Sequence, residues 1–299
     1  MPSAGFNSIG GFMNIQIMIG GIRFRFDLNF EIKVEDALSP FLCIDKKETD
    51  VNIKVIYDKN IVVTPPEEKI GEDLLLEYYQ EKGQLLCLAK GGTGKYLSST
   101  VCDSSFEFLE CCICINPAAF KTLGNILRFL PMCMILQQKN ILFFHASQIE
   151  TCGKGILFSA PSGTGKTTQA KLWKKYRNAR IICNDRTLIR ECSTYGYPVD
   201  GSEPVGSGEI LPLGAVICLE QAESNEIRRL RPKEALQRLL PEMVICSWHP
   251  QMKVLAIEQL LLLMEKYPVY LFQCTKTESA VNCLETQLKE DGVIENAKY

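Results

Sequence analysis

The chain has 299 residues, a formal net charge of −2, 46% hydrophobic residues and 23% charged residues. Such a composition is typical of a globular protein with a sizeable core, long enough for two domains or for one large α/β domain with an elaborated N-terminal part. A net charge this close to zero leaves no basic footprint for nucleic acid or for an anionic membrane, so we expect neither as a partner.

The 14 cysteines lie mostly inside apolar runs, where cysteine behaves as a small hydrophobic residue. They indicate a reducing compartment, and no apolar run reaches the ~20 residues of a membrane span or resembles a signal peptide, so we expect a cytoplasmic protein. Cys111, Cys112 and Cys114 form the tightest cluster. The alternation from Cys111 to Ile115 favours a strand over a zinc site, which would need a second pair of ligands at a suitable distance.

Residues 1–120 are predicted to form a mainly β region, because short apolar or β-branched runs alternate with Gly, Pro and charged breaks. Within it, Gly91-Gly92-Thr93-Gly94-Lys95 looks like a phosphate-binding loop. Tyr96 follows the lysine where Ser or Thr is needed, and the next residues are strand-like, so we predict a hairpin turn instead. The predicted strands are 14–18, 22–26, 51–57, 85–89 and 106–115, with 72–80 left unassigned.

The second domain is predicted to span residues 121–299. Helical periodicity over 118–138 is broken by Pro131 into one kinked or two short helices, and a short buried strand over 141–144 then delivers His145 at its end. Further on, 195–207 is rich in Gly, Pro and Ser, which predicts a mobile active-site loop. The remaining predicted elements are strands at 213–219 and 269–274 and helices at 232–240, 251–266 and 277–289, the last capped by Thr277.

The stretch from Gly153 to Gln169 has a sequence pattern that indicates a binding function and not only a place in the core. Residues 155–158 predict a buried strand, 160–167 a tight loop and 168–176 a helix, which is the order of a phosphate-binding P-loop. Glycines let backbone N–H groups turn toward phosphate oxygens, and the helix N-terminus faces the same anion. Ala160 stands where the first glycine of the loop usually lies. The predicted nucleotide-binding residues are Ser162, Gly163, Thr164, Gly165, Lys166, Thr167 and Thr168, with Lys166 on the terminal phosphates and the Thr167 hydroxyl on Mg²⁺.

A predicted strand over 180–183 ends in Asn184-Asp185-Arg186. Because a strand, helix and second parallel strand return the chain beside the loop, we expect Asp185 near the nucleotide phosphates. Its carboxylate would ligate Mg²⁺ or take the proton of an acceptor hydroxyl, with a capping or surface role as the alternative. Arg186 would clamp a phosphate or form a plain salt bridge. His145 would orient Asp185 across the sheet or be an ordinary core histidine, and His249 is predicted to be structural.

Arg228, Arg229, Arg231 and Lys233 make the one dense basic run, just before a predicted helix. Such a run favours a solvated face. The functional alternatives are contact with nucleotide phosphates, with an acidic partner or with an adjacent subunit.

These motifs together resemble the HPr kinase/phosphorylase-like branch of the phosphoenolpyruvate carboxykinase superfamily, and most closely its small HPr-kinase-related bacterial proteins, some encoded beside peptide-maturation genes. The resemblance covers roughly residues 140–290. It implies an α/β fold in which a P-loop carboxykinase-like kinase domain follows the mainly β N-terminal region, and it implies a homo-oligomer. The residues that carry it are His145-Ala146-Ser147, 155–168, Asn184-Asp185-Arg186, 196–202 and 225–240.

The resemblance implies ATP-dependent phosphorylation of a hydroxyl. His145 matches the family's catalytic histidine and Asp185 its acid, while Lys166 and Thr167 match the loop lysine and the metal-binding hydroxyl. The family's paired acids become Asn184-Asp185 here, so HPr itself is not the expected substrate. We expect an ATP- and Mg²⁺-dependent kinase acting on a hydroxyl of a peptide, of a protein, or of a hydroxy amino acid or similar small molecule. The alternative is a nucleotide-sensing binding module without transfer activity.

Overall fold

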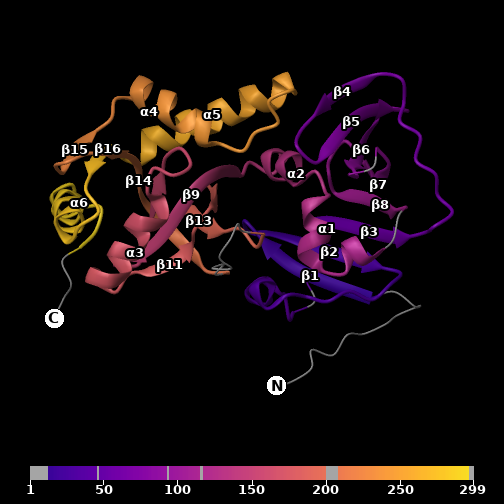
Figure 1. The fold of residues 1–299 in the computed structure, drawn as a ribbon, viewed down its shortest axis with the longest axis horizontal. Helices are drawn as coiled ribbons and strands as arrows, with labels where there is room; N and C mark the ends of the chain where they lie inside the picture. Colours follow the sequence, from indigo (N-terminus) through magenta and orange to yellow (C-terminus); the bar gives the residue numbers. More distant parts are fainter. Residues whose placement is uncertain (1–12, 46, 93, 115–116, 200–207, 296–299) are drawn as a thin grey trace. The chain divides into compact units, whose positions relative to one another are not determined.

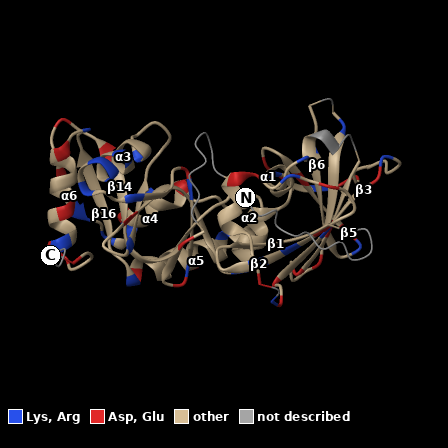
Figure 2. Ribbon diagram, turned by 90° about the horizontal axis from the view of Figure 1, so that it is seen from below, with Lys and Arg blue, Asp and Glu red and all other residues tan. Residues whose placement is uncertain are grey.

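A computed structural model describes residues 13–45, 47–92, 94–114, 117–199 and 208–295 of the chain. The protein is a mixed α/β protein with 28% helix and 39% strand, built on two mixed β-sheets. Its contacts divide it into two units, residues 1–139 with 246–250 and residues 140–245 with 251–299 (Figure 1). Acidic and basic residues are interspersed over the elements of both units (Figure 2). In the described ranges no helix is long and apolar enough to cross a membrane.

The first unit is built on a sheet whose described strands follow the order β1-β2-β3-β8-β7-β6-β5-β4. β2, β3 and β8 run parallel to one another, and the other neighbouring pairs are antiparallel. The mainly β character predicted for the N-terminal region is confirmed. The strands are β1 (Met13–Ile19), β2 (Ile22–Leu28), β3 (Val51–Tyr57), β4 (Lys69–Glu72), β5 (Leu76–Glu81), β6 (Gln84–Lys90), β7 (Tyr96–Cys102) and β8 (Phe108–Ile113).

Alternation of buried and exposed side chains explains these strands, because successive residues of a strand face opposite sides of its sheet. In β8, Leu109, Cys111 and Ile113 are buried while Phe108 and Glu110 are exposed. Cys111 and Cys112 of the cysteine cluster therefore lie in a strand, as the alternation predicted, and Cys114 follows it directly.

The glycine-rich segment 91–95 joins β6 to β7, which pair antiparallel. The Gly91 N–H donates to the Lys95 carbonyl at 2.9 Å, which closes the turn. The prediction of a hairpin turn is therefore confirmed. The unassigned segment 72–80 contributes to β4 and β5, where Leu76, Tyr78 and Tyr79 are buried.

Two short helices, α1 (Leu123–Arg128) and α2 (Met132–Gln138), occupy the region where helical periodicity was predicted, and Pro131 separates them. The first unit continues to Lys139, beyond the expected boundary near residue 120. One reason is that the first turn of α1 is bonded to the unit's own chain: the Leu123 N–H donates to the Lys33 carbonyl and the Gly124 N–H to the Glu35 carboxylate.

The first unit also includes residues 246–250, from a distant part of the chain. The Trp248 ring packs on the Tyr78 ring with centroids 4.5 Å apart. The His249 N–H donates to the Cys246 carbonyl at 3.0 Å, so this histidine lies in a turn. Aromatic packing therefore assigns this segment to the first unit.

The second unit contains a sheet with the order β10-β9-β12-β13-β14-β16-β15, and β11 pairs with β9 beside this path. β10 also pairs with β14, so β10, β9, β12, β13 and β14 close into a ring. β10, β14 and β16 are parallel, so their carboxyl ends share one edge. The strands are β9 (Leu142–Thr151), β10 (Lys154–Ser159), β11 (Arg180–Cys183), β12 (Arg186–Arg190), β13 (Ser193–Gly196), β14 (Ile210–Gln221), β15 (Glu226–Arg229) and β16 (Val269–Cys274).

Helices cover both faces of the parallel strands. Ile156 and Phe158 of β10 join a core with α3 and α6, whereas Leu157 joins a second core with α4 and α5. Each of these parallel strands therefore contributes to two apolar layers, one on each face. The helices are α3 (Lys166–Arg177), α4 (Pro232–Leu239), α5 (Pro250–Lys266) and α6 (Glu278–Glu290). Thr277 is the N-cap residue of α6, but its hydroxyl bonds other hydroxyls and makes no capping bond.

Two expectations for this unit need correction. His145 does not end a short strand, because β9 continues to Thr151 through two buried polar residues that find partners: the Ser147 hydroxyl donates to the Asn184 carbonyl and the Gln148 amide to the Thr194 hydroxyl. The segment predicted as a mobile loop begins instead as strand β13, and the buried Tyr197 ring lies 4.7 Å from that of Phe143. Residues 200–207 of that segment lie outside the described residues.

Candidate active site

The P-loop sequence forms the connection between β10 and α3. Gly163 has φ of +80° and Gly165 has φ of +118°, in the left-handed region that side chains with a Cβ disfavour. The Thr164 N–H donates to the Pro161 carbonyl at 3.2 Å, which tightens the loop. Because Gly165 is the N-cap of α3 and has no capping side chain, the first-turn amides of the helix face the loop.

Lys166 is the first residue of α3 and is only 7% exposed. Its ammonium group donates to the Ala160 carbonyl at 2.5 Å and to the Pro161 carbonyl at 3.4 Å. Burial lowers the pKa of this lysine, and the nearby Glu242 and Asp185 carboxylates act in the opposite direction. An entering phosphate group would compete with the two carbonyls for the ammonium and would restore the solvation that burial removes.

The side chain of Gln221 braces the same loop and was not anticipated from the sequence. It lies at the end of β14, the parallel neighbour of β10. Its amide nitrogen donates to the carbonyls of Gly163 at 3.2 Å and Thr164 at 3.1 Å. The only available signal was a polar residue ending an apolar strand, which is too common a feature to predict this contact.

Strand register explains how His145 reaches the loop. Ser159, the last residue of β10, pairs with Ala146 of β9, so His145 is the first β9 residue beyond the end of β10. On its other side His145 pairs with Arg186 of β12. β9 thus places His145 between the end of β10, where the P-loop begins, and the start of β12, which directly follows Asp185.

Asp185 and His145 are in direct contact, with 2.5 Å between the Asp185 Oδ1 and His145 Nε2 atoms. His145 and Asp185 are therefore neighbours across the sheet, as one of the two alternatives for His145 predicted. β10 and β11 are both antiparallel to β9, so they are parallel to each other with β9 between them. Because β9 is the direct neighbour of β11, it is His145 of β9, and not a residue of β10, that lies beside Asp185.

Glu242 is a third member of this array that the sequence did not indicate. It ends the short 3-10 helix η3 (Leu240–Glu242), is 9% exposed, and has its Oε2 atom 3.7 Å from His145 Nδ1. The imidazole therefore lies between two carboxylates, and both of them act on the pKa of Lys166. No short-range pattern connects residue 242 to residue 145, because α4 and η3 reach the site only through the tertiary fold.

Arg186 and Asn184 flank the acid. The Arg186 Nε atom is 3.8 Å from Asp185 Oδ2, and its guanidinium carbon lies 6.0 Å from the centroid of the Phe143 ring. This side chain is exposed, so its ion pair contributes little stability and leaves it able to meet an anion. Asn184 is 8% exposed, and its carbonyl accepts a bond of 2.5 Å from the Ser147 hydroxyl.

The donor set suits a magnesium–nucleotide complex better than a metal held by protein alone. Thr167 and Thr168 lie in the first turn of α3, beside the loop, and Asp185 supplies carboxylate oxygens. Among the described residues no group of three His, Cys, Asp or Glu side chains could hold a metal ion. Mg²⁺ is typically held by one or two protein oxygens together with substrate phosphates and water, which these residues fit.

The basic run before α4 lies outside this array. Arg228 and Arg229 are in β15, and Arg228 forms an ion pair of 2.9 Å with Glu234 of α4. Arg231 is the N-cap of α4, and Arg228, Arg229 and Arg231 are exposed. This arrangement favours the solvated face, with the Arg228–Glu234 ion pair joining β15 to α4.

Comparison with known proteins gives no match: no model of a protein family fits the chain, and no curated protein is similar to it at a significant level.

Proposed function

We propose that the protein is an ATP- and Mg²⁺-dependent kinase of the P-loop carboxykinase-like kind, which transfers a phosphoryl group to a hydroxyl. The observation that carries the proposal is the convergence of a P-loop lysine with an Asp–His pair. Lys166 is held in the loop that follows β10, and β9, the neighbour of β10, carries His145 in contact with Asp185. A plain phosphate-binding loop would not need the pair.

In this proposal the loop and Lys166 hold the phosphates of ATP, and Thr167 and Asp185 hold the metal. Bound Mg²⁺ would offset the charge of the phosphates during transfer. Asp185 takes the proton of the acceptor hydroxyl, and the oxygen of that hydroxyl forms a bond to the γ-phosphorus. The bond from that phosphorus to the β–γ bridging oxygen breaks, and ADP leaves with the electron pair.

His145 positions the acid in this mechanism. In this proposal His145 Nε2 donates to the Asp185 carboxylate across their 2.5 Å contact, because a carboxylate that takes up a proton can only accept hydrogen bonds beforehand. That bond holds one Asp185 oxygen, and the other oxygen, which has two lone pairs, would face both the metal and the acceptor hydroxyl. Glu242 Oε2 lies 3.7 Å from His145 Nδ1 on the far side of the ring, and its negative charge there would help to hold the imidazole beside Asp185.

The test is transfer from labelled ATP to a panel of Ser- and Thr-containing peptides, proteins and hydroxy amino acids. We expect Asp185→Asn to reduce turnover by about 10²- to 10⁴-fold, because it removes the proton acceptor and a metal ligand. ATP binding, measured by calorimetry, should persist in that variant. Undiminished turnover of Asp185→Asn would contradict the proposal.

A second candidate function is a nucleotide-sensing module that binds ATP without transferring its phosphate. Asn184 favours it, because an amide stands where the resembling family has a second acid, and this residue is buried. Tight ATP binding by the wild-type protein together with no transfer to any acceptor in the panel would select this function.

A further inference from the structure

A cavity of about 260 Å³ lies at the amino ends of the parallel strands of the second unit. Its lining includes Lys154, the first residue of β10, and Arg229, the last residue of β15, which pairs with the start of β16. Among the described residues that line it, Lys266 at the end of α5 and Asp291 after α6 are the other charged ones. The P-loop follows the opposite end of β10, about 17 Å away along a strand of 6 residues at ~3.3 Å each. The cavity is therefore distinct from the candidate active site.

The cations of this cavity are not balanced by carboxylates. Lys154, Arg229 and Lys266 form no ion pair with any of the residues that the structure describes. Asp291 is bonded to neutral groups instead: the Tyr270 hydroxyl donates to it at 2.5 Å and the Gln287 amide at 3.2 Å. Burial, together with this carboxylate, raises the pKa of Tyr270, so its hydroxyl remains a donor. The positive charge of the lining is therefore available to a ligand.

A glycine in a β-bulge shapes one wall of the cavity. The register between β10 and β14 shifts at Gly214, which is an extra residue of β14 at this point. A Cβ there would lie 2.8 Å from Ile156 Cδ1 and 3.2 Å from both Lys154 Cβ and Val293 Cγ1. Bulges redirect side chains and occur often beside functional sites. The bulge and the missing side chain together let Lys154 stand close to the segment that follows α6.

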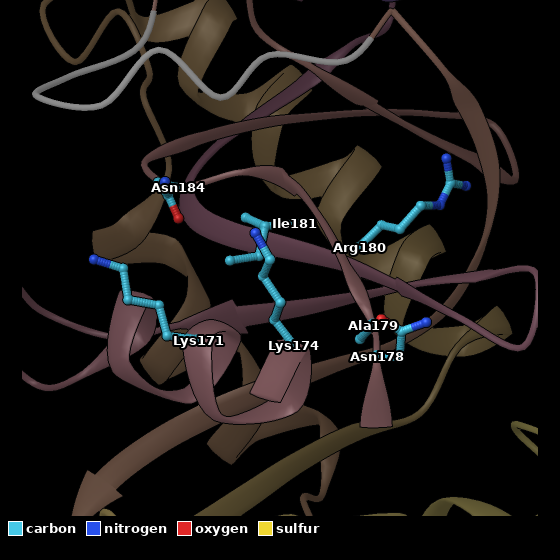
Figure 3. A pocket seen from close by; sticks show the side chains of 7 residues that line it. All are labelled: Lys171, Lys174, Asn178, Ala179, Arg180, Ile181 and Asn184. Atoms are coloured by element: carbon cyan, nitrogen blue, oxygen red, sulfur yellow. The ribbon is translucent and has the colours of Figure 1, made fainter. Parts of the chain in front are cut away.

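A larger basic cavity, of about 560 Å³ between α3 and β11, differs in the state of its charges (Figure 3). In that cavity Arg180 points away from the lysines of α3 and is bonded to two carboxylates, at 3.0 Å to Glu150 and 2.6 Å to Glu209. Lys171 and Asn184 also have interaction partners. Groups of the protein itself therefore engage these side chains, in contrast to the three cations at the amino ends of the strands.

We propose that the cavity at the amino ends of the strands, which we call the amino-edge pocket (Lys154, Arg229 and Lys266), binds the phosphate group of a small ligand. Three cations and the Asp291 carboxylate leave its lining with two positive charges, which a phosphate dianion would balance. Its volume is below the roughly 300 Å³ at which pockets for drug-sized ligands begin, which favours a small molecule over a protein segment. The inference does not depend on the proposed kinase function.

The structural alternative accounts for only one of the cations. Lys266 lies in the last turn of α5, where a positive charge complements the negative end of the helix. Lys154 and Arg229 lie on strands, so no helix end explains their charge. Guanidinium and ammonium groups from three separate elements would instead surround the oxygens of a phosphate group.

The test is equilibrium dialysis of the full chain with labelled inorganic phosphate at low ionic strength. Every protein also carries Lys166→Ala, which removes the lysine of the P-loop from the comparison. Phosphate should bind saturably in this background. The change Lys154→Met/Lys266→Met keeps the aliphatic stems and removes two charges, so it should weaken phosphate binding roughly 5- to 10-fold, as two partly exposed ion pairs allow.

The matched control is Lys233→Met/Lys253→Met, which removes the same charge from two exposed lysines that do not line the cavity. It should change the affinity by less than about 2-fold, because screening weakens the effect of distant charges. An equal loss in the two double variants overturns the inference, and so does the absence of saturable binding in the Lys166→Ala background.

Displacement of the labelled phosphate identifies the source of the group. If methyl phosphate or glycerol 3-phosphate displaces it at lower concentration than unlabelled phosphate does, the pocket takes a phosphorylated small molecule. If both are weaker, it takes free phosphate, and either result supports the pocket. Displacement by acetate as effective as that by phosphate would indicate a basic surface without selectivity and would overturn the inference.

Discussion

The tetrapeptide Gly-Thr-Gly-Lys occurs twice in this chain, at residues 92–95 and 163–166, in two different structural settings. The first copy lies between the antiparallel strands β6 and β7, and the second joins strand β10 to helix α3. Lys95 is exposed, whereas Lys166 is 7% exposed and donates to two loop carbonyls.

The difference comes from the element that begins at the end of each copy. Tyr96 begins a strand whose amides and carbonyls bond to the neighbouring strands of the sheet, so the first copy is not followed by a helix N-terminus. Thr167 continues a helix whose first-turn amides have no partner within the helix. A phosphate-binding loop therefore depends on the helix after it as much as on its own glycines.

Within this comparison, the largest expected effect contrasts the two lysines. Lys166→Ala should lower turnover by about 10²- to 10³-fold, because it removes a charge directed at the transferring phosphate. Lys95→Ala should change neither turnover nor ATP affinity. Steady-state kinetics and calorimetry on both variants check this, and a similar loss in both would mean that the second copy of the tetrapeptide has no special role.

Matched glycines sharpen the comparison. Gly94 has φ of +73° and Gly165 has φ of +118°, so alanine at either position should cost about 1–2 kcal/mol of unfolding free energy. Only Gly165→Ala should also weaken ATP binding, because it shifts the loop amides. Urea denaturation together with calorimetry separates the two effects, and an unchanged ATP affinity in Gly165→Ala would contradict the assignment of this loop.

The pH dependence of ATP binding tests the burial of Lys166. Its pKa is lowered from 10.5 by burial, so as pH rises the ammonium is lost earlier than on an ordinary lysine, and ATP affinity should fall with it. Over the same interval folding stability gains from this group, because the unfolded chain binds the proton that the folded chain has lost. Lys166→Arg stays charged and should flatten the affinity profile, while Lys95→Ala should leave it unchanged.

The smallest effect is expected at the acid that no linear pattern indicated. Glu242→Gln keeps the shape of the side chain and removes the charge beside His145, so turnover should fall by roughly 3- to 10-fold with little change in ATP affinity. Glu258→Gln, an exposed change on α5, is the matched control. Equal turnover in both variants would show that Glu242 does not support the Asp–His pair.

Much of the fold can be predicted from local pattern. Period-two alternation identified most strands of the first unit, and helical spacing interrupted by Pro131 predicted the break between α1 and α2. Short-range features failed where polar residues are buried. Ser147 and Gln148 made β9 look shorter than it is, because their partners, the Asn184 carbonyl and the Thr194 hydroxyl, come from distant parts of the chain.

The sequence by itself determined the P-loop, since strand, glycine turn, lysine and helix are contiguous and their geometry is local. It also determined that an acid comes directly after the next strand. Only the tertiary structure decided that β9 lies between β10 and β11, which brings His145 to Asp185, and that η3 carries Glu242 to the other side of the imidazole. Strand order and the meeting of distant helices depend on how apolar faces pack against one another, and a one-dimensional pattern does not record that packing.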